Sequence, residues 1–424
     1  MSVVKKSSMG LFINLSVMMF LLFFTWGAWF ASVGIFMNQA GMAEFIGWAY
    51  STTPIAAIIT PFFMGVFADR FMNAERLQGI LLILSGIAIA IAPQFASAET
   101  PEIFIIILLV HALCFMPTLG LSNTICLKHL ANSEKDYPIV RIFATLGWIV
   151  AGLFISKGLQ ADTSVIQFYV AGIAAVVVGV YSFFMPKTPP AGKGEPLSVG
   201  DICGVQTFPY FRKPAFAFFI IASFLAAIAM MPYWANGGTF LAESGIKGAA
   251  GFLTYGQMAE LVVLAFILPV FIRKFGIKWT MIIGMSCWVI RYVLFSFAAG
   301  GMAEGGLVAG QLTEPSSAAF PLLFGAVILH GFAYDFVFIS GYLYVDKNVG
   351  ENVRAQAQGL LTVVTQGIGF LISSQLFAGY LYNKAMTDGS SFSAWKGFWL
   401  IPAGYLVVVL VLFCLLFRPK KADL

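Results

Sequence analysis

Four charged side chains lie inside long apolar stretches or at their edges, and these are the first candidates for chemistry. Glu260, Arg291 and Asp335 fall near the middle of such stretches, and Arg141 falls near one end of another. A charge at the centre of a membrane-spanning helix costs roughly 2.5–3.5 kcal/mol, so such residues normally face a polar solute or a partner. Their chemistry would be the carriage of protons and the binding of a polar solute.

Asp335, in the segment HGFAYDFVFISG, is the first candidate for carrying a proton. Surroundings of low dielectric constant disfavour a charged carboxylate, which would let Asp335 take up and release a proton. The alternative is a permanent ion pair with Arg291, which lies at a similar depth in the preceding apolar stretch. We assign proton coupling to Asp335, Glu260 and Arg291, and the ion pair stays open as an alternative.

Glu260 is predicted to share one helical face with Gln257, which lies three residues earlier. A carboxylate and an amide on one face offer acceptors and donors to hydroxyl groups or to the edge of a heterocycle. The alternative is hydrogen bonding between helices, for which an uncharged amide would be sufficient. We therefore favour a solute-binding role for both side chains.

The segment MPYWANGG, residues 231–238, predicts a local break in its helix because it contains Pro232 and a glycine pair. Such a break frees backbone groups that can line a polar space. Tyr233 and Trp234 could stack on a ring, and Asn236 could form hydrogen bonds beside them. The alternative is an aromatic belt at the membrane surface, where tryptophan and tyrosine are enriched.

Arg141, Thr145 and Trp148 are spaced i, i+4, i+7, so a helix places them on one face. A guanidinium, a hydroxyl and an indole in line suit a ring-bearing solute with several hydroxyl groups. The alternative is an arginine that extends to the cytoplasmic surface, as Arg354 would in the second half. His111 and His330 are the histidines within apolar stretches, and each alone is more typical of a hydrogen-bonded packing residue.

Asp69 and Arg70 end the segment GVFADR, at the cytoplasmic end of the second apolar stretch. An acid and a base at the membrane edge, preceded by a glycine that allows close helix approach, suit a latch between helices. We predict a cytoplasmic gate that contains Asp69, Arg70 and Arg354.

The elements that position these residues must be membrane helices. Of the 424 residues, 60% are hydrophobic and 10% are charged, and the mean hydropathy is +0.89. A soluble globular chain carries roughly 25% charged residues. The five cysteines form no CxxC pair, and three histidines without a metal-binding or nucleophilic motif indicate neither a metal site, a cofactor nor an enzyme.

A spanning helix needs about 20 apolar residues, and the chain has room for twelve. The predicted fold is all-α, with twelve helices that form two bundles of six and are embedded in a lipid bilayer. The predicted spans are 9–37, 44–68, 77–97, 101–128, 138–158, 165–185, 214–241, 249–272, 278–299, 320–345, 354–383 and 394–417.

The basic residues predict the orientation of the spans. With a cytoplasmic N-terminus, eighteen of the 24 Lys and Arg residues fall in inner segments, which follows the positive-inside rule and places both termini in the cytoplasm. This bias accounts for the net charge of +5 without nucleic-acid binding. The inner loop 186–213 divides the chain into an N-terminal bundle, 1–185, and a C-terminal bundle with a short tail, 214–424. Such paired bundles are typical of transporters.

Several stretches of the sequence resemble the bacterial nucleoside:proton symporters of the major facilitator superfamily. GxxxDR after the second span is similar to the loop signature of the superfamily, although the usual basic tail is missing. The stretches similar to the symporter family are Trp26-Gly27-Ala28-Trp29, Phe115-Met116-Pro117-Thr118-Leu119-Gly120-Leu121, Arg141-x-x-x-Thr145, Gln257-x-x-Glu260, Asp335-Phe336, Ile339-Ser340-Gly341 and Arg354-Ala355-x-Ala357-Gln358-Gly359. They occur in order from the first span to the eleventh.

The resemblance implies a proton-driven importer of nucleosides in an inner membrane, working by alternating access. We expect the protein to be a monomer. It implies solute binding by the positions of Arg141, Thr145, Trp148, Gln257, Glu260, His330 and Tyr334, with Asp335 as the protonation site. Trp148, His330 and Tyr334 stand where the family more often carries phenylalanine, tyrosine and phenylalanine, respectively.

Span seven departs further from the family pattern. Met231 and Trp234 replace amide side chains that would read the nucleobase. The alternative function is therefore a proton symporter for a sugar or another small polar metabolite.

Overall fold

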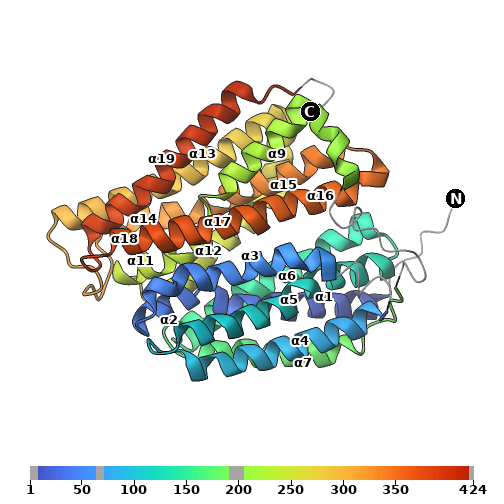
Figure 1. The fold of residues 1–424 in the computed structure, drawn as a ribbon, viewed down its shortest axis with the longest axis horizontal. Helices are drawn as coiled ribbons and strands as arrows, with labels where there is room; N and C mark the ends of the chain where they lie inside the picture. Colours follow the sequence, from blue (N-terminus) through green and yellow to red (C-terminus); the bar gives the residue numbers. More distant parts are fainter. Residues whose placement is uncertain (1–7, 64–70, 191–204, 420–424) are drawn as a thin grey trace. The chain divides into compact units, whose positions relative to one another are not determined.

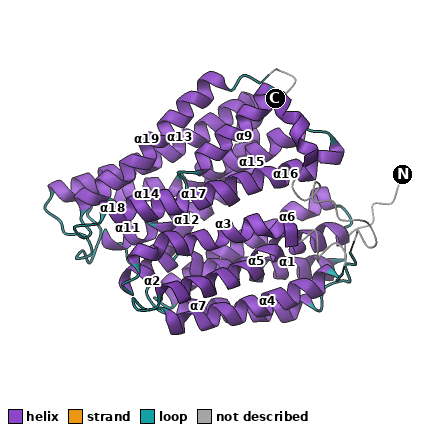
Figure 2. Ribbon diagram, in the orientation of Figure 1, coloured by secondary structure: helices purple, strands orange, loops and turns teal. Residues whose placement is uncertain are grey.

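The computed structural model describes residues 8–63, 71–190 and 205–419, and this part of the chain folds into helices without a strand (Figures 1 and 2). Nine helical stretches in these ranges are long and apolar enough to cross a membrane. Helices suit an apolar chain because they satisfy their backbone hydrogen bonds internally. The prediction of an all-α membrane protein is confirmed.

One stretch, Ala249–Glu304, is 56 residues long and contains two of the predicted spans. Gly276 breaks it with φ 74° and ψ 170°, a backbone conformation that favours glycine. Ile166–Ser182 is shorter than the nine, and α3 (Ile46–Phe63) lies within the second predicted span, 44–68, of which residues 64–68 are outside the described part. Each of the twelve predicted spans therefore falls on a helical stretch.

The chain divides into two compact units, Met1–Met42 with Ile55–Ser198, and Ala43–Pro54 with Val199–Leu424. The sequence predicts halves at 1–185 and 214–424, so the observed grouping differs by placing Ala43–Pro54 with the second unit. Hydrogen bonds account for this grouping. Ser374 Oγ donates to the Tyr50 carbonyl (3.2 Å), and Gln375 Nε2 donates to Ser51 Oγ (2.7 Å).

The first unit is a helical bundle in which glycines permit close packing of its helices. Besides residues 55–63 of α3, its helices are α1 (Met9–Phe30), α2 (Val33–Gln39), α4 (Ala74–Ile91), α5 (Pro101–His129), α6 (Ser133–Leu153) and α7 (Ile166–Ser182). A Cβ added to Gly86 of α4 would lie 2.7 Å from the Gly172 carbonyl oxygen of α7. Small residues of this kind let membrane helices approach each other closely.

The second unit contains the remaining helices. They are α9 (Pro214–Ala227), α10 (Met231–Ala235), α11 (Gly237–Glu243), α12 (Ala249–Val262), α13 (Leu268–Glu304), α14 (Phe320–Ile328), α15 (His330–Asn348), α16 (Arg354–Thr362), α17 (Phe370–Ser373), α18 (Tyr382–Ala385) and α19 (Phe392–Leu416). The π-helical stretches Val263–Ile267, Val363–Gly369 and Ser374–Leu381 join some of them. Figure 1 labels most of these helices.

Two predicted spans of the second unit are broken into shorter helices. Residues 228–230 separate α9 from α10, and Asn236 separates α10 from α11, which confirms the break predicted from Pro232 and the glycine pair. Leu329 separates α14 from α15 at a position where the sequence predicts a continuous helix. The interruptions at Asn236 and Leu329 lie at or next to two residues that the sequence selects for solute binding, Asn236 and His330.

Candidate functional site

Two glycines bring Glu260 of α12 against His330 of α15. A Cβ on Gly331 would lie 2.7 Å from Glu260 Cα, and a Cβ on Gly256 would lie 2.8 Å from His330 Cβ. A larger residue at either position would force the two helices apart. Helices α12 and α15 therefore approach each other tightly where these polar side chains are placed.

Glu260 and His330 form a contact of ion-pair length, with His330 Nε2 3.6 Å from Glu260 Oε2. The histidine side chain is 3% exposed and the glutamate side chain is 17% exposed. His330 is therefore enclosed, while Glu260 keeps surface available to a solute. The sequence favours a packing role for a single histidine, and the structure gives this one a carboxylate neighbour.

Two aromatic rings stack with the His330 imidazole. The centroid of the Tyr233 ring lies 5.1 Å away at an interplanar angle of 17°, and that of Tyr334 lies 5.6 Å away at 23°. Trp234 meets the imidazole edge-on at 5.7 Å. Tyr233 is fully buried and cannot belong to a membrane-surface belt, whereas Trp234 and Tyr334 are half-buried.

Asn236 and Gln257 have different surroundings within this unit. Asn236 is fully buried, and its Nδ2 donates to the Ala378 carbonyl (3.3 Å), so it braces the break between α10 and α11. Gln257 is 7% exposed, and its Oε1 has no hydrogen-bond partner in the described ranges. Asn236 Oδ1, like Gln257 Oε1, has no hydrogen-bond partner among the described residues, so a solute-binding role stays a prediction for both side chains.

Asp335 lies on α15 and is 1% exposed. Its Oδ2 accepts no hydrogen bond from any residue that the structure describes. The carboxyl groups of Asp335 and Glu260 are close enough to interact electrostatically. A proton on Asp335 would therefore change the charge environment of Glu260.

Arg291 does not pair with Asp335, so the structure contradicts the permanent ion pair that the sequence leaves open. The guanidinium carbon lies 3.9 Å from the centroid of the Tyr233 ring and 4.6 Å from that of Trp288. Arg291 Nε donates to the Ala326 carbonyl (2.9 Å). Within the described residues, both terminal nitrogens of this fully buried side chain have no acceptor.

In the first unit, Arg141 and Trp148 of α6 lie against aromatic side chains of α1. The Arg141 guanidinium carbon is 4.4 Å from the centroid of the Phe23 ring, and Trp148 meets Trp26 at 5.3 Å and 82°. Thr145 is half-buried on the same helix. A Cβ on Gly27 of α1 would lie 2.9 Å from the Trp148 carbonyl oxygen, so this glycine permits the approach.

His111 is enclosed in the first unit. Its Nδ1 lies 2.8 Å from Ser85 Oγ, and the side chain is fully buried. Trp29 meets the imidazole edge-on at 5.3 Å. This environment is that of a packing residue, as the sequence favours.

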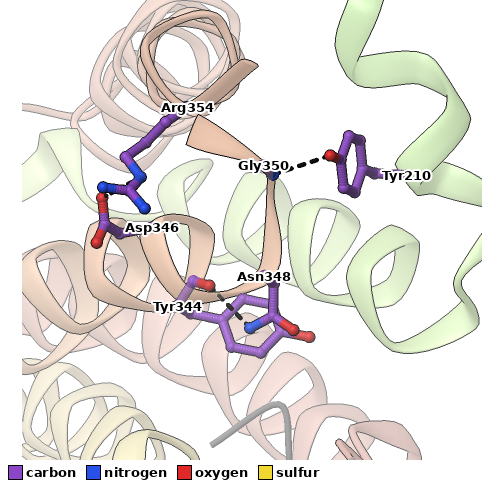
Figure 3. Close-up of polar contacts among 6 residues, drawn as sticks. All are labelled: Tyr210, Tyr344, Asp346, Asn348, Gly350 and Arg354. Atoms are coloured by element: carbon purple, nitrogen blue, oxygen red, sulfur yellow. Dashed lines mark hydrogen bonds and ion pairs between the residues drawn. The ribbon is translucent and has the colours of Figure 1, made fainter. Parts of the chain in front are cut away.

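Arg354, the described member of the predicted gate, pairs with Asp346 of α15 (Figure 3). Arg354 Nε lies 2.9 Å from Asp346 Oδ1, and both side chains are about 40% exposed. Asp69 and Arg70 lie outside the described residues.

The loop between α15 and α16 is held by a second contact, in which the Gly350 N–H donates to Tyr210 Oη (2.8 Å), as Figure 3 shows. Tyr210 belongs to the short 3₁₀ helix Val205–Arg212, before α9.

Sequence reasoning missed the residues that bring the site together, which are Gly256, Gly331 and Trp288. Gly331, directly after His330, could indicate a close approach of another helix, but the sequence does not show which helix lies opposite. In the described ranges, His, Cys, Asp and Glu side chains form no group of three that could hold a metal ion.

The family comparison and the similar proteins named here match nearly the whole chain, and each of them is described as a carrier of nucleosides or of xanthosine. Residues 9–422 match a protein family described as "Nucleoside H+ symporter". YegT of Escherichia coli (strain K12), named as a nucleoside transporter, is 34% identical over 97% of this chain and 95% of its own length. Xanthosine permease of the same organism is 32% identical over 96% of this chain and 95% of its own length.

The fold has a solved counterpart. A crystal structure of a mutant form of the nucleoside transporter NupG matches with a TM-score of 0.85 and 28% identity, covering 96% of this chain and 100% of the other.

Proposed function

Because this chain belongs to the nucleoside H+ symporter family, we propose that it imports nucleosides together with protons by alternating access. It is a multi-pass membrane transporter and not an enzyme. We place it in a bacterial inner membrane as a monomer with both termini in the cytoplasm. The distribution of Lys and Arg supports this orientation.

The observation that carries the proposal is the contact between Glu260 and His330, with the buried Asp335 on the same helix as His330. In this proposal Asp335 takes up the proton. Glu260 binds hydroxyl groups of the solute, and it responds to the protonation of Asp335 because the two carboxyl groups interact. The contact between α15 and α12 thereby links proton binding to solute binding.

Ring-bearing parts of the solute have aromatic partners in the second unit. Trp234 and Tyr334 are half-buried, and their rings lie beside the His330 imidazole, which contacts Glu260. Gln257 supplies an amide acceptor on the face of α12 that carries Glu260. We propose that these four side chains bind the nucleoside, and that Arg141, Thr145 and Trp148 form the corresponding group of the first unit.

Accumulation of radiolabelled uridine or adenosine by proteoliposomes tests the proposal. An imposed proton gradient, acidic outside, should drive uptake, and a protonophore should abolish it. Uptake should also alkalinise the outer medium. Accumulation that follows a sodium gradient and ignores the protonophore would contradict proton coupling.

A sugar or another polar metabolite is the second candidate, because Met231 and Trp234 lack the amides that would read a base. Met231 is fully buried, and Trp234 offers a ring face that a sugar could also use. Competition for uridine uptake by a panel of nucleosides, bases and sugars separates the two. A sugar that competes better than every nucleoside would favour this candidate.

A further inference from the structure

We propose that Trp288, Arg291 and Tyr292 of α13 are positioning residues, which hold the two broken helices in register and thereby align the solute-binding side chains. The proposal rests on the proposed function, because the side chains aligned are those that would bind a nucleoside. All three positioning residues are fully buried, so they act through their neighbours and not by touching the solute.

Tyr292 holds the break between α9 and α10. Its Oη donates to the Ala229 carbonyl (2.7 Å) and lies 3.3 Å from the Met230 carbonyl oxygen. These carbonyls belong to residues 228–230, where the regular helix is interrupted. A backbone carbonyl that loses its helical partner in an apolar environment needs another donor, and the tyrosine hydroxyl supplies it.

Arg291 and Trp288 hold the two sides of the break between α14 and α15. Arg291 Nε donates to the Ala326 carbonyl of α14 (2.9 Å). Trp288 Nε1 donates to the Ala333 carbonyl of α15 (2.9 Å). The acceptors lie three residues before Leu329 and four residues after it, so α13 bridges the interruption.

The spacing of the three donors explains how one helix reaches both breaks. Positions i, i+3 and i+4 lie on one face of an α-helix, and residues 288, 291 and 292 have this spacing. This face of α13 therefore supplies a fixed row of donors.

Contacts then lead from this row to the solute-binding side chains. The Arg291 guanidinium lies over the Tyr233 ring (3.9 Å), and Tyr233 stacks on His330 (5.1 Å between centroids). His330 in turn contacts Glu260 at 3.6 Å. A shift of α10 or α15 relative to α13 would move His330 and so reorient the Glu260 carboxylate.

Tyr292→Phe tests the proposal because it removes one hydroxyl and keeps the ring that stacks on Trp399. Tyr405→Phe is the matched control. Tyr405 lies on α19, and its Oη donates to the carbonyl of Leu225 in the last turn of α9 (3.0 Å). Both variants therefore lose a tyrosine-to-backbone hydrogen bond to the same span, and only Tyr292→Phe removes a donor of α13 and a bond to the interrupted residues 228–230.

The readouts are the Kd for uridine and the melting temperature of the purified protein. A buried hydrogen bond contributes about 0.5–1.5 kcal/mol, so we expect Tyr292→Phe to raise the Kd about threefold to tenfold. Tyr405→Phe should leave the Kd within about twofold. Arg291→Lys keeps the charge but loses the planar guanidinium and Nε, and it should weaken binding at least as much as Tyr292→Phe.

Two results would overturn the proposal. The first leaves the proposed function standing, and the second overturns it as well. Wild-type protein that binds uridine, with Tyr292→Phe and Arg291→Lys binding as tightly as Tyr405→Phe, would overturn the positioning role alone. Wild-type protein that neither binds nor transports any nucleoside would overturn the proposed function together with this inference.

Discussion

Gly331→Ala is a small substitution with a specific expected effect on the contact between α12 and α15. The new Cβ would lie 2.7 Å from Glu260 Cα and 2.9 Å from Glu260 N, which are backbone atoms that cannot turn aside. Ordinary contacts of a Cβ lie at 3.4–4 Å. The two helices must therefore separate by about 0.7 Å at this point, on the difference between those distances.

The expected cost has a structural and a functional part. Overpacking of this kind costs typically about 1–3 kcal/mol, and alanine in place of glycine returns up to about 1 kcal/mol of helix propensity. Net destabilisation should therefore be about 0–2 kcal/mol. The contact between His330 Nε2 and Glu260 Oε2, now 3.6 Å, would lengthen past ion-pair range. Misplacement by about 1 Å can cost on the order of 100-fold in rate, so we expect uridine kcat/KM to fall roughly 10- to 100-fold.

Proton-driven uptake in proteoliposomes, with the protein quantified after reconstitution, measures this effect. Gly404→Ala on α19 is the control, because a Cβ there would meet no described atom within 4 Å. It makes the same chemical change in another apolar helix and should leave kcat/KM unchanged. If Gly331→Ala and Gly404→Ala transport alike, the close approach of α12 and α15 does not determine the geometry of Glu260.

Three further substitutions test other parts of the proposal. Asp335→Asn should abolish uphill uptake but spare solute exchange, because an amide cannot carry the proton; accumulation at the wild-type level would rule out Asp335 as the proton carrier. Trp148→Ala should weaken nucleoside binding by about 1–3 kcal/mol, the usual value of a base stacked on an aromatic ring, measured as KM; an unchanged KM would refute that stacking. Arg354→Gln removes the exposed ion pair with Asp346, which is worth no more than about 1 kcal/mol, so the melting temperature should fall by no more than about 2–4 °C. A larger fall would mean that the pair is part of a wider network.

Features that depend on a single stretch of sequence could be predicted. Apolar runs separated by charged segments predict the helical stretches. Pro232 and the glycine pair after Asn236 predict a local break in this helix, because both act on their own backbone.

Features that depend on the rotation of one helix against another could not be predicted. Arg291 and Asp335 lie at similar depths in their spans, which allows an ion pair, but each residue advances the helix by about 100°. Packing against α10 turns Arg291 toward Tyr233 instead. The contact of His330 with Glu260 likewise depends on which helix lies against Gly331, and a single sequence does not contain that information.

The π-helical stretches of the second unit are the places where its spans can lose one residue without rotating their flanking residues. A π turn holds one more residue than an α turn, so deletion of a residue from 263–267 would convert it to regular α-helix while the residues on both sides keep their faces. A one-residue gap in relatives at this stretch, or at Val363–Gly369 or Ser374–Leu381, would therefore leave Glu260 and its neighbours in place. The same deletion in α15 would rotate His330 away from the residues that follow it.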